Sequence, residues 1–487
     1  MSARILTIAE MRDAEQRVMD AGTPGFDLMR RAGLAVAAKA AAMAPEGAIA
    51  VLCGPGNNGG DGYVAAEALR AAGRDVALYS ACSVDQLEGD AEIAVAKWAG
   101  GVAPLDGARD TDAALIIDAL FGAGLSRPLE GLPAELAGYE WSLVVSVDTP
   151  SGLSGDGAPP AGPVFRANAT VTFAALRPAH VLAETAAYCG EVVIADIGLP
   201  ANVVAAAGSD LWLNDPDLWL DQFPWPAETS HKHSRGRLMC VTGGPSNTGA
   251  ARLAARAGLR AGAGAVTLLS PRAAVFVNAI HSTAVMVKAF EDAETLRVAA
   301  EPAQCVVIGP AAGVTEATRD NVLALADGPA ALVADADALT VFEDAPDTLF
   351  AALRPKDVLT PHLGEFKRIF PGVLAGAANR IEATRRAADL AGCVVLLKGP
   401  DTVIAAPGGR TVVNRHASPF LATAGSGDVL AGIIGGLIAQ GMASFEAACA
   451  AAWLHGEAGL SLGPGLIAED LVEALPTALQ ALYTPPA

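Results

Sequence analysis

The sequence predicts an α/β protein of two domains, each with a mostly parallel sheet between two layers of helices. Short runs that are apolar throughout alternate with Ala-rich helical stretches, and such strands are typical of sheets covered on both faces. This alternation stops between Pro200 and Ser234, in a segment rich in Pro and Trp, and then restarts. The 487 residues can bury two cores. We therefore predict domains 1–215 and 216–487.

In the first domain, successive βαβ units predict a Rossmann-like, doubly wound sheet. Helices are expected at 63–72 and 89–99. Strands are expected at 49–53, 76–79, 114–117, 143–147, 169–173 and 191–194.

In the second domain the same alternation predicts another three-layer α/β fold. The apolar stretch from Val429 to about Ala443 is short and broken by Gly, so it predicts a buried core helix and not a membrane span. Strands are expected at 238–242, 265–269, 305–308, 331–334, 358–360, 394–397 and 402–405.

Composition and charge exclude several classes of protein. The chain is 52% hydrophobic and 18% charged, which is typical of a folded globular protein. The formal net charge of -20 argues against nucleic-acid binding and against a polybasic membrane anchor, because both need a basic face. The seven cysteines are widely spaced without a CxxC pair, and no apolar run of signal-peptide length precedes Glu10. We expect a cytoplasmic protein.

A glycine-rich segment follows the first strand. It reads Gly54-Pro-Gly-Asn-Asn-Gly-Gly-Asp-Gly62 and is expected to form a turn that leads into a helix. Glycines at such a turn let backbone N–H groups approach a phosphate at the helix N-terminus. The GxGxxG spacing alone is weak evidence for a redox dinucleotide fold, and Tyr79-Ser80 stands where that fold has an acid.

Two more loops follow strands at the same predicted sheet edge. One begins at Asp118 and continues to Pro128, and the other reads Asp148-Thr-Pro-Ser151. Parallel sheets bind ligands at the carboxyl ends of their strands. Because Asn58, Asp118 and Ser151 all offer oxygen, the three loops together indicate a site for a hard monovalent cation.

These motifs resemble the N-terminal epimerase domain of the NAD(P)H-hydrate repair proteins. The resemblance implies that Asn58, Asp118 and Ser151 bind potassium and that Asp148 is the acid–base group of the epimerase. It also implies a binding site for the hydrated dinucleotide, made by Asn57, Asn58, Gly59, Gly60, Asp61, Gly122, Ala123, Gly124, Leu125, Ser126, Arg127, Pro128 and Asp148.

The strongest motif of the second domain is Gly425-Ser426-Gly427-Asp428. A Gly-Ser-Gly loop that opens a helix leaves amides free to bind an anion, and Asp428 would lie in the first turn. Such a carboxylate can take a proton from an attacking hydroxyl while the amides hold a transferring phosphoryl group. Other strand-end loops carry Lys398-Gly399, His362, Gly309–Gly313 and Asp335-Ala336-Asp337.

These strings are similar to the C-terminal dehydratase domain of the same repair proteins, a relative of the ribokinase group. The resemblance covers about Thr7 to Pro476. It implies that Asp428 is the catalytic base, that Gly313, His362 and Asp428 contact the dinucleotide, and that ADP binds between residues 398–402 and 418–427. The nucleotide-binding residues that it implies are Lys398, Gly399, Pro400, Asp401, Thr402, Ala424, Gly425, Ser426 and Gly427.

The chain departs from the family pattern at Ala311 and Ala424, where the resemblance implies glycines, and at Ala312, where it implies a leucine. Ala311 puts a Cβ at a position for which a positive φ or a close backbone approach is predicted. We expect an active enzyme whose nucleotide affinity or preference differs from that of its relatives.

The resemblance implies a metabolite-repair enzyme that interconverts the R and S forms of NAD(P)H hydrate and dehydrates the S form with ADP or ATP. Phosphorylation makes the hydroxyl a good leaving group, and its elimination regenerates NAD(P)H. The implied cofactors are K+ and Mg2+, and a homo-oligomer is expected. Two alternatives stay open, a ribokinase-like kinase of a small alcohol and an N-terminal domain that only binds ligands or serves as a scaffold.

Overall fold

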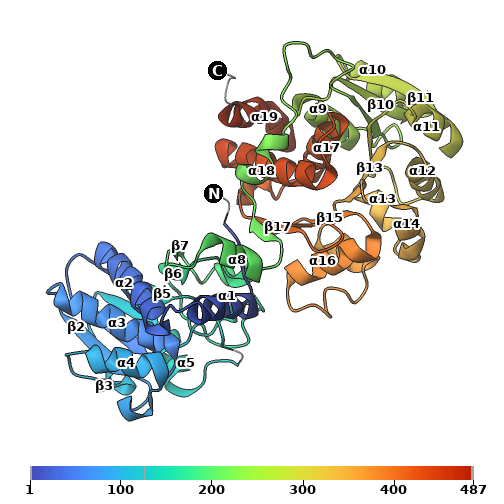
Figure 1. The fold of residues 1–487 in the computed structure, drawn as a ribbon. Helices are drawn as coiled ribbons and strands as arrows, with labels where there is room; N and C mark the ends of the chain where they lie inside the picture. The colour runs from blue at the N-terminus through green and yellow to red at the C-terminus, as the bar shows by residue number, and fades with distance from the viewer. Residues whose placement is uncertain (1–2, 126, 484–487) are drawn as a thin grey trace. The chain divides into compact units, whose positions relative to one another are not determined.

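The computed structural model describes residues 3–125 and 127–483 of the chain. The described residues divide into two compact units (Figure 1), an N-terminal unit, Ala3–Leu211, and a C-terminal unit that begins at Trp212. Each unit is a sheet covered by helices, as the sequence predicts.

The N-terminal unit is built on a seven-stranded sheet with the order β3-β2-β1-β4-β5-β6-β7, and all neighbouring strands are parallel. The order reverses between β1 and β4, and open α/β sheets bind ligands at such a point. The strands are β1 (Ile49–Cys53), β2 (Val76–Ser80), β3 (Ala103–Pro104), β4 (Leu115–Ala119), β5 (Val144–Val147), β6 (Ala169–Phe173) and β7 (Glu191–Ala195).

Helices cover both faces of this sheet. One face packs on α1 (Ile8–Asp20), α2 (Gly25–Met43), α3 (Asn57–Ala71) and α4 (Gly89–Lys97). The other face packs on α5 (Gly131–Ala137) and on the 3-10 turn Leu105–Asp110. Three short helices complete the unit, α6 (Pro178–Val181), α7 (Ala183–Ala186) and α8 (Ala201–Ala207).

The glycine-rich segment corrects one prediction. Helix α3 begins at Asn57 and not near 63, so most of the expected turn is the first part of the helix. Its glycines allow close packing instead of a loop conformation, since a Cβ on Gly59 would overlap the Gly54 carbonyl, and one on Gly54 would overlap that of Leu120. Similarly, Asp118 lies inside β4 and not in the loop after it.

The C-terminal unit contains a ten-stranded sheet with the order β11-β10-β9-β12-β13-β14-β15-β16-β17-β8. Pairing is parallel from β11 to β15 and antiparallel in the hairpins β15–β16 and β16–β17. The strands are β8 (Leu211–Leu213), β9 (Arg237–Val241), β10 (Ala265–Pro271), β11 (Met286–Phe290), β12 (Cys305–Ile308), β13 (Ala331–Ala334), β14 (Val358–Leu359), β15 (Val394–Leu397), β16 (Thr402–Ala405) and β17 (Thr411–Asn414).

Two apolar cores flank this sheet. One lies under α9 (Gly249–Arg260), α17 (Ser426–Ala439), α18 (Ser444–Leu462) and α19 (Ala468–Leu482). The other lies under α11 (Ala293–Ala300), α12 (Glu316–Ala326), α15 (Leu363–Ile369) and α16 (Arg380–Ala391). Short helix α10 (Val275–Ile280) lies between β10 and β11, and short helices α13 (Asp337–Thr340) and α14 (Pro346–Ala352) lie between β13 and β14.

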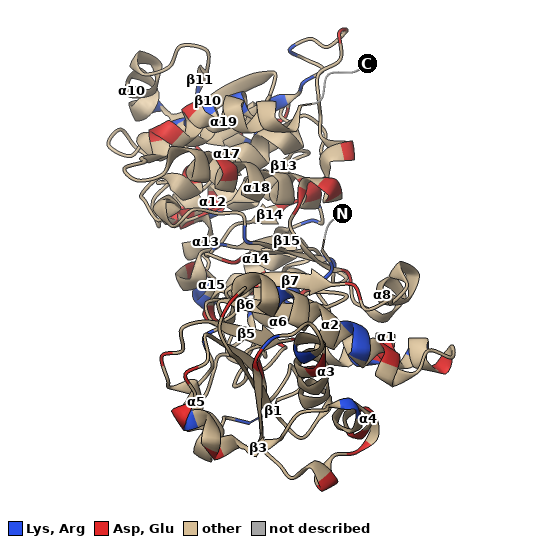
Figure 2. Cartoon of the chain, turned by 90° about the vertical axis from the view of Figure 1, so that its left-hand side faces the viewer, with Lys and Arg blue, Asp and Glu red and all other residues tan. Residues whose placement is uncertain are grey.

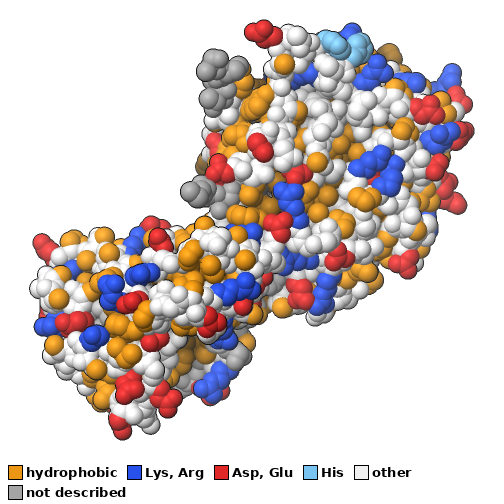
Figure 3. Space-filling model, in the orientation of Figure 1, with side chains coloured by type: hydrophobic (Ala, Val, Ile, Leu, Met, Phe, Trp, Pro, Cys, Tyr) orange, Lys and Arg blue, Asp and Glu red, His pale blue; other side chains and the backbone are white. Residues whose placement is uncertain are grey.

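Helix α17 confirms the predicted core helix, because nearly all of its residues are buried. Within residues 3–125 and 127–483, none of the helices combines the length and the hydrophobicity needed to cross a lipid bilayer. Charged residues of both signs are spread along the helices and loops of each unit (Figure 2) and over the visible surface (Figure 3).

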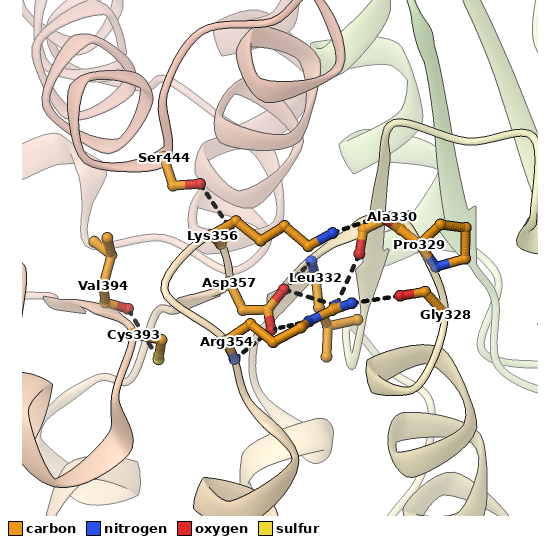
Figure 4. A network of polar contacts seen from close by, with 10 residues as sticks. All are labelled: Gly328, Pro329, Ala330, Leu332, Arg354, Lys356, Asp357, Cys393, Val394 and Ser444. Atoms are coloured by element: carbon orange, nitrogen blue, oxygen red, sulfur yellow. Dashed lines mark hydrogen bonds and ion pairs between the residues drawn. The ribbon is translucent and has the colours of Figure 1, made fainter.

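A buried ion pair joins the segments that precede β13 and β14 (Figure 4). Asp357 is fully buried and accepts hydrogen bonds from the backbone N–H groups of Leu332 and Arg354, each at 2.8 Å. The Arg354 guanidinium contacts both carboxylate oxygens and also donates to the carbonyls of Gly328 and Ala330. Every oxygen of this carboxylate is therefore satisfied.

Replacing Asp357 by Ala is expected to lower the free energy of unfolding of the C-terminal unit by about 3–5 kcal/mol, since the change removes the counter-charge of a partly buried guanidinium and leaves two buried amides without an acceptor. Urea unfolding measures this loss. The control is Asp347→Ala on exposed α14, for which a loss of about 1 kcal/mol or less is expected. Equal losses in the two variants would contradict the structural role of Asp357.

Candidate functional site

A cavity of about 500 Å3 opens at the point where the strand order of the N-terminal sheet reverses. Its walls come from α1, α2, the start of α3, and the segments after β4 and β5. Asn57, Asn58 and Asp61 line it from α3, and Gly122 to Leu125 line it from the segment after β4. The cavity thus lies where the sequence predicts a ligand.

The N-terminus of α3 faces this cavity. The helix is 15 residues long, its N-cap is Gly56, and Gly56, Asn57 and Asn58 all line the cavity. The first N–H groups of a helix have no intrahelical acceptor and carry a partial positive charge. This wall can therefore hold a phosphate group.

Asp148 follows β5 with a φ of 60°, one of four non-glycine residues with a positive φ in the described chain. Its carboxylate accepts hydrogen bonds from Thr172 Oγ1 at 2.9 Å and from Ala123 N at 3.4 Å, and it lies 3.3 Å from the guanidinium of buried Arg177. The His180 ring contacts the Asp148 carbonyl through Nε2 at 2.8 Å. Backbone strain held in this way by neighbours is typical of functional sites.

Several titratable groups surround Asp148. Burial raises the pKa of Asp61 well above its usual range, and the nearby Asp148 and Glu15 carboxylates raise it further. Burial also raises the pKa of Glu15, although Arg177 opposes the shift. Burial lowers the pKa of His180 to about 4, so its imidazole is neutral at pH 7. The site therefore sets two acids with raised pKa values beside the Asp148 side chain, an arrangement suited to proton transfer.

The predicted cation ligands come together in part. Asp118 is fully buried and accepts from Ser151 N at 2.8 Å, from Ser151 Oγ at 2.6 Å and from Ser146 Oγ at 2.9 Å. Ser151 Oγ also lies 3.0 Å from the Phe121 carbonyl. A Cβ on Gly122, the residue after Phe121, would lie 2.8 Å from Asn58 Oδ1. The buried Nδ2 of Asn58 has no hydrogen-bond partner among the described residues.

Other predicted residues of the N-terminal site lie outside the cavity walls. Gly59 packs on Gly54, and Gly60 packs on Met29 and Ala91. Arg127 and Pro128 do not line the cavity. Ser126 lies outside the described residues.

Sequence reasoning missed Arg12, Glu15, Arg177 and His180. Arg12 and Glu15 line the cavity from α1, Arg177 lines it from the start of α6, and His180 holds the Asp148 backbone. The sequence contains only a weak signal for this group, a single His that stands three residues after an Arg that follows β6.

The second site lies at the carboxyl ends of the parallel strands of the C-terminal sheet. Helix α17 starts at Ser426, its N-cap Gly425 has a φ of 88°, and Asp428 lies in the first turn. Among the described residues, no backbone carbonyl accepts a hydrogen bond from the N–H groups of Gly427 or Asp428. The predicted pairing of a carboxylate with unsatisfied helix amides is confirmed.

Lys398 ends β15 beside this helix. Its Nζ donates to Asp335 Oδ1 at 2.6 Å, and a Cβ on Gly427 would lie 3.3 Å from it. Burial raises the pKa of Asp428 to about 6, Asp335 and Asp337 add to the shift, and Lys398 opposes it. Asp428 is thus a base whose pKa lies close to neutral pH.

Some of the predicted nucleotide-binding side chains have partners inside the protein. Ser426 Oγ contacts the Nε2 atom of buried His455 at 3.0 Å, and Asp401 is buried 3.4 Å from Arg380. Thr402 Oγ1 donates to the Gly399 carbonyl at 2.8 Å and closes the turn that contains exposed Pro400. These residues shape the loops, and Ala424 is exposed.

The predicted dinucleotide contacts lie on neighbouring strand ends. His362 pairs with Lys398 through an isolated bridge and caps α15, because its Nδ1 accepts from Gly364 N at 2.9 Å. Its side chain is 53% exposed and therefore accessible to a ligand. Gly313 N donates to Asp337 at 2.8 Å. Ala311 has a φ of 53°, which confirms the left-handed backbone predicted there.

The fold and these two sites define a two-domain α/β protein in which a Rossmann-like unit precedes a ribokinase-like one. A family described as YjeF-related protein N-terminus matches residues 25–179, and one described as NAD(P)H-hydrate dehydratase matches residues 238–478. The chain belongs to the family of bifunctional NAD(P)H-hydrate repair enzymes, because its relatives in that family match it from end to end.

Two of these relatives and one solved structure illustrate the match. The bifunctional NAD(P)H-hydrate repair enzyme Nnr of Moorella thermoacetica is 34% identical over 516 residues, which cover 98% of this chain and 97% of that protein. Nnr of Thermofilum pendens is 35% identical over 489 residues, 93% of this chain and 92% of that protein. A ribokinase-like superfamily protein of Enterococcus faecalis is 25% identical, has a TM-score of 0.50, and covers 57% of this chain and 98% of that chain.

Proposed function

We propose that this protein repairs hydrated NADH and NADPH with two active sites, an epimerase in domain 1–215 and an ADP- or ATP-dependent dehydratase in domain 216–487. The observation that carries the proposal is Asp428, a carboxylate with a pKa of about 6 at the unsatisfied amides of a helix N-terminus. Relatives named for this repair activity match both halves of the chain.

In the dehydratase, Asp428 accepts the proton of the substrate hydroxyl as its oxygen attacks the terminal phosphorus of ADP or ATP. AMP or ADP leaves, and the new phosphate ester then loses phosphate while a ring proton departs, which restores NAD(P)H. The free amides of Gly427 and Asp428 and the Lys398 ammonium are suited to the charge on the transferred group. Mg2+ is expected to accompany the nucleotide phosphates.

In the epimerase, Asp148 transfers the proton that opens and closes the hydrated centre. Arg177 and Thr172 orient its carboxylate, and the α3 amides hold a phosphate of the dinucleotide. Asn57, Asp61 and the segment Gly122–Leu125 form the walls that contact the substrate.

Potassium fits the group formed by Asn58, Asp118 and Ser151. Burial is the main cause of the raised pKa of the Asp118 carboxyl. Ser146 and Ser151 donate hydrogen bonds to it, but among the described residues no Lys or Arg forms an ion pair with it. The oxygen atoms near the Asp118 carboxylate belong to hydroxyl, side-chain amide and carbonyl groups, which are hard ligands for a cation. A bound cation would supply the missing positive charge and fix the loop after β4.

The direct test is incubation of the purified chain with NADH hydrate, ADP and Mg2+, with restored NADH followed by its absorbance. Conversion of both epimers is expected. Phosphorylation of a small alcohol without any recovery of NADH would refute the repair function and favour a kinase.

The rate of dehydration is expected to fall as the pH drops through about 6. Asp428 must be ionised to act as a base, and its raised pKa is about 6. The measurement is the pH profile of kcat/KM for the S epimer between pH 5 and 8, taken under conditions in which NADH survives long enough to be read. A profile that stays flat to pH 5 would contradict this assignment of the base.

We also expect the protein to be a homo-oligomer. Phe276 and Ile280 on α10 are 74% and 62% exposed, and Met286 on the edge strand β11 is 53% exposed. Apolar side chains gathered at a sheet edge are typical of subunit contacts. Light scattering of the full chain tests this expectation, and a monomeric mass at micromolar concentration would contradict it.

A further inference from the structure

The segment Asp335-Ala336-Asp337 has no role in the function proposed above, yet it lies at the centre of the second site. It follows β13, between the loop after β12 and the end of β15. Asp335 is 1% exposed, and its carboxylate holds Lys398 Nζ at 2.6 Å. Two residues on, Asp337 accepts a hydrogen bond from Gly313 N at 2.8 Å.

The backbone at Ala336 explains how two nearby carboxylates reach partners on different strands. Ala336 has a φ of 50° and a ψ of -117°, a conformation that L-residues rarely adopt. Such conformations cost on the order of 1–3 kcal/mol and persist where the surroundings require them. The turn is also tightly packed, because a Cβ on Gly309 would overlap the Asp335 carbonyl.

We propose that this segment positions both substrates of the dehydratase, with Asp335 holding Lys398 against the nucleotide's terminal phosphate and Asp337 holding the Gly313 loop against the hydrated dinucleotide. The inference rests on the repair function proposed above. Asp335 and Asp337 are positioning residues, since they act through Lys398 and Gly313.

The geometry supports the nucleotide half of this proposal. Lys398 has a flexible side chain, and the 2.6 Å contact with Asp335 fixes its ammonium beside Gly427, at the start of α17. Burial disfavours the ammonium, but Asp335, Glu365 and Asp428 more than compensate, so the pKa of Lys398 is raised. The ammonium is therefore charged and directed toward the unsatisfied amides.

Because charged groups surround Asp428, the proposal can be tested by its titration, without a measurement of enzyme activity. The charged groups that face it are Asp335 after β13, Asp337 at the start of α13 and Lys398 at the end of β15, while Glu365 on α15 faces Lys398 and His362. Removing the negative charge of Asp335 must lower the pKa of Asp428, and removing the positive charge of Lys398 must raise it.

The first experiment is an NMR titration of the full chain labelled with 13Cγ-aspartate. The Asp428 resonance is assigned by its disappearance in Asp428→Asn. The midpoint of the Asp428 titration is expected to move to lower pH in Asp335→Asn and to higher pH in Lys398→Met. Asp344→Asn, a change at an exposed acid, should leave it unchanged. Shifts of the same sign in the first two variants would overturn the proposal.

The second experiment is a double-mutant cycle on the rate of NADH recovery. Asp335→Asn is expected to lower kcat at least tenfold in the wild-type chain and less than threefold in a chain that already carries Lys398→Met. Asp335→Glu should recover part of the loss. Asp337→Ala should raise KM for the hydrate and leave KM for ADP unchanged. Equal losses from Asp335→Asn in both backgrounds would overturn the proposal, whereas a wild-type chain that restores no NADH would refute the repair function and leave the titration as the deciding test.

Discussion

Replacing Asp428 by Asn is expected to lower the rate of hydrate dehydration by about 10²–10⁴-fold, the usual contribution of a positioned general base. Asn keeps the shape of the side chain in the first turn of α17 but cannot accept the hydroxyl proton. The measurement is NADH recovery from the S epimer at saturating ADP, with ADP binding followed separately by calorimetry. ADP binding should persist, because the amides and Lys398 remain.

The stability of the Asp428→Asn variant against unfolding should not fall with its activity. The pKa of Asp428 is raised in the folded chain, so the ionised carboxylate destabilises the fold above about pH 6 relative to a neutral side chain. At pH 7 the Asn variant should therefore unfold at an equal or higher urea concentration than the wild type. The matched control is Asp344→Asn, for which activity and stability stay unchanged. A variant at 428 that retains more than a tenth of the activity would contradict the role of this carboxylate.

The strands that position both sites could be predicted because buried parallel strands are apolar throughout. Strands 49–53, 169–173, 305–308 and 331–334 have the predicted bounds, and the strand-end residues Asp148 and Lys398 follow from such patterns. Asp428 follows instead from the Gly-Ser-Gly-Asp motif at the start of α17. Edge strand β11 could not be found in this way, since Lys288 interrupts its apolar run and only Phe290 of the strand is buried.

The start of α3 was predicted wrongly for a different reason. Asn and Gly have low helix propensity, so the string from Asn57 to Gly62 resembles a turn. Tertiary packing overrides this preference, because helix α3 lies so close to Gly54, Met29 and Ala119 that larger residues do not fit.

The partners of Asp148 could not be predicted because they come from distant parts of the chain. Glu15 lies on α1, whereas Arg177 and His180 come from the start of α6, and no local spacing links them to the strand end. Their proximity is a result of the sheet order and appears only in three dimensions. The pairing of Asp335 with Lys398, 63 residues apart, is of the same kind.

The largest effect in the N-terminal unit is expected for Asp148→Asn, which should lower the rate of epimerisation by about 10²–10⁴-fold. Asn tolerates the positive φ of 60° better than most residues, so the backbone and its contact with His180 should persist. The amide cannot exchange a proton with the substrate and loses the charge attraction to Arg177. With excess ADP, recovery of NADH from a mixture of epimers should then stop near the fraction present in the S form.

The control for this variant is Asp112→Asn, an exposed acid in the same unit, which should convert both epimers at the wild-type rate. A second variant, His180→Ala, separates chemistry from geometry. It keeps the Asp148 carboxylate but removes the ring that contacts the strained carbonyl, so it should slow epimerisation while its pH dependence stays that of the wild type. Complete conversion of both epimers by Asp148→Asn at the normal rate would exclude this carboxylate as the acid–base group. Asp61 and Glu15, two further acids that line the cavity, would then be the alternatives.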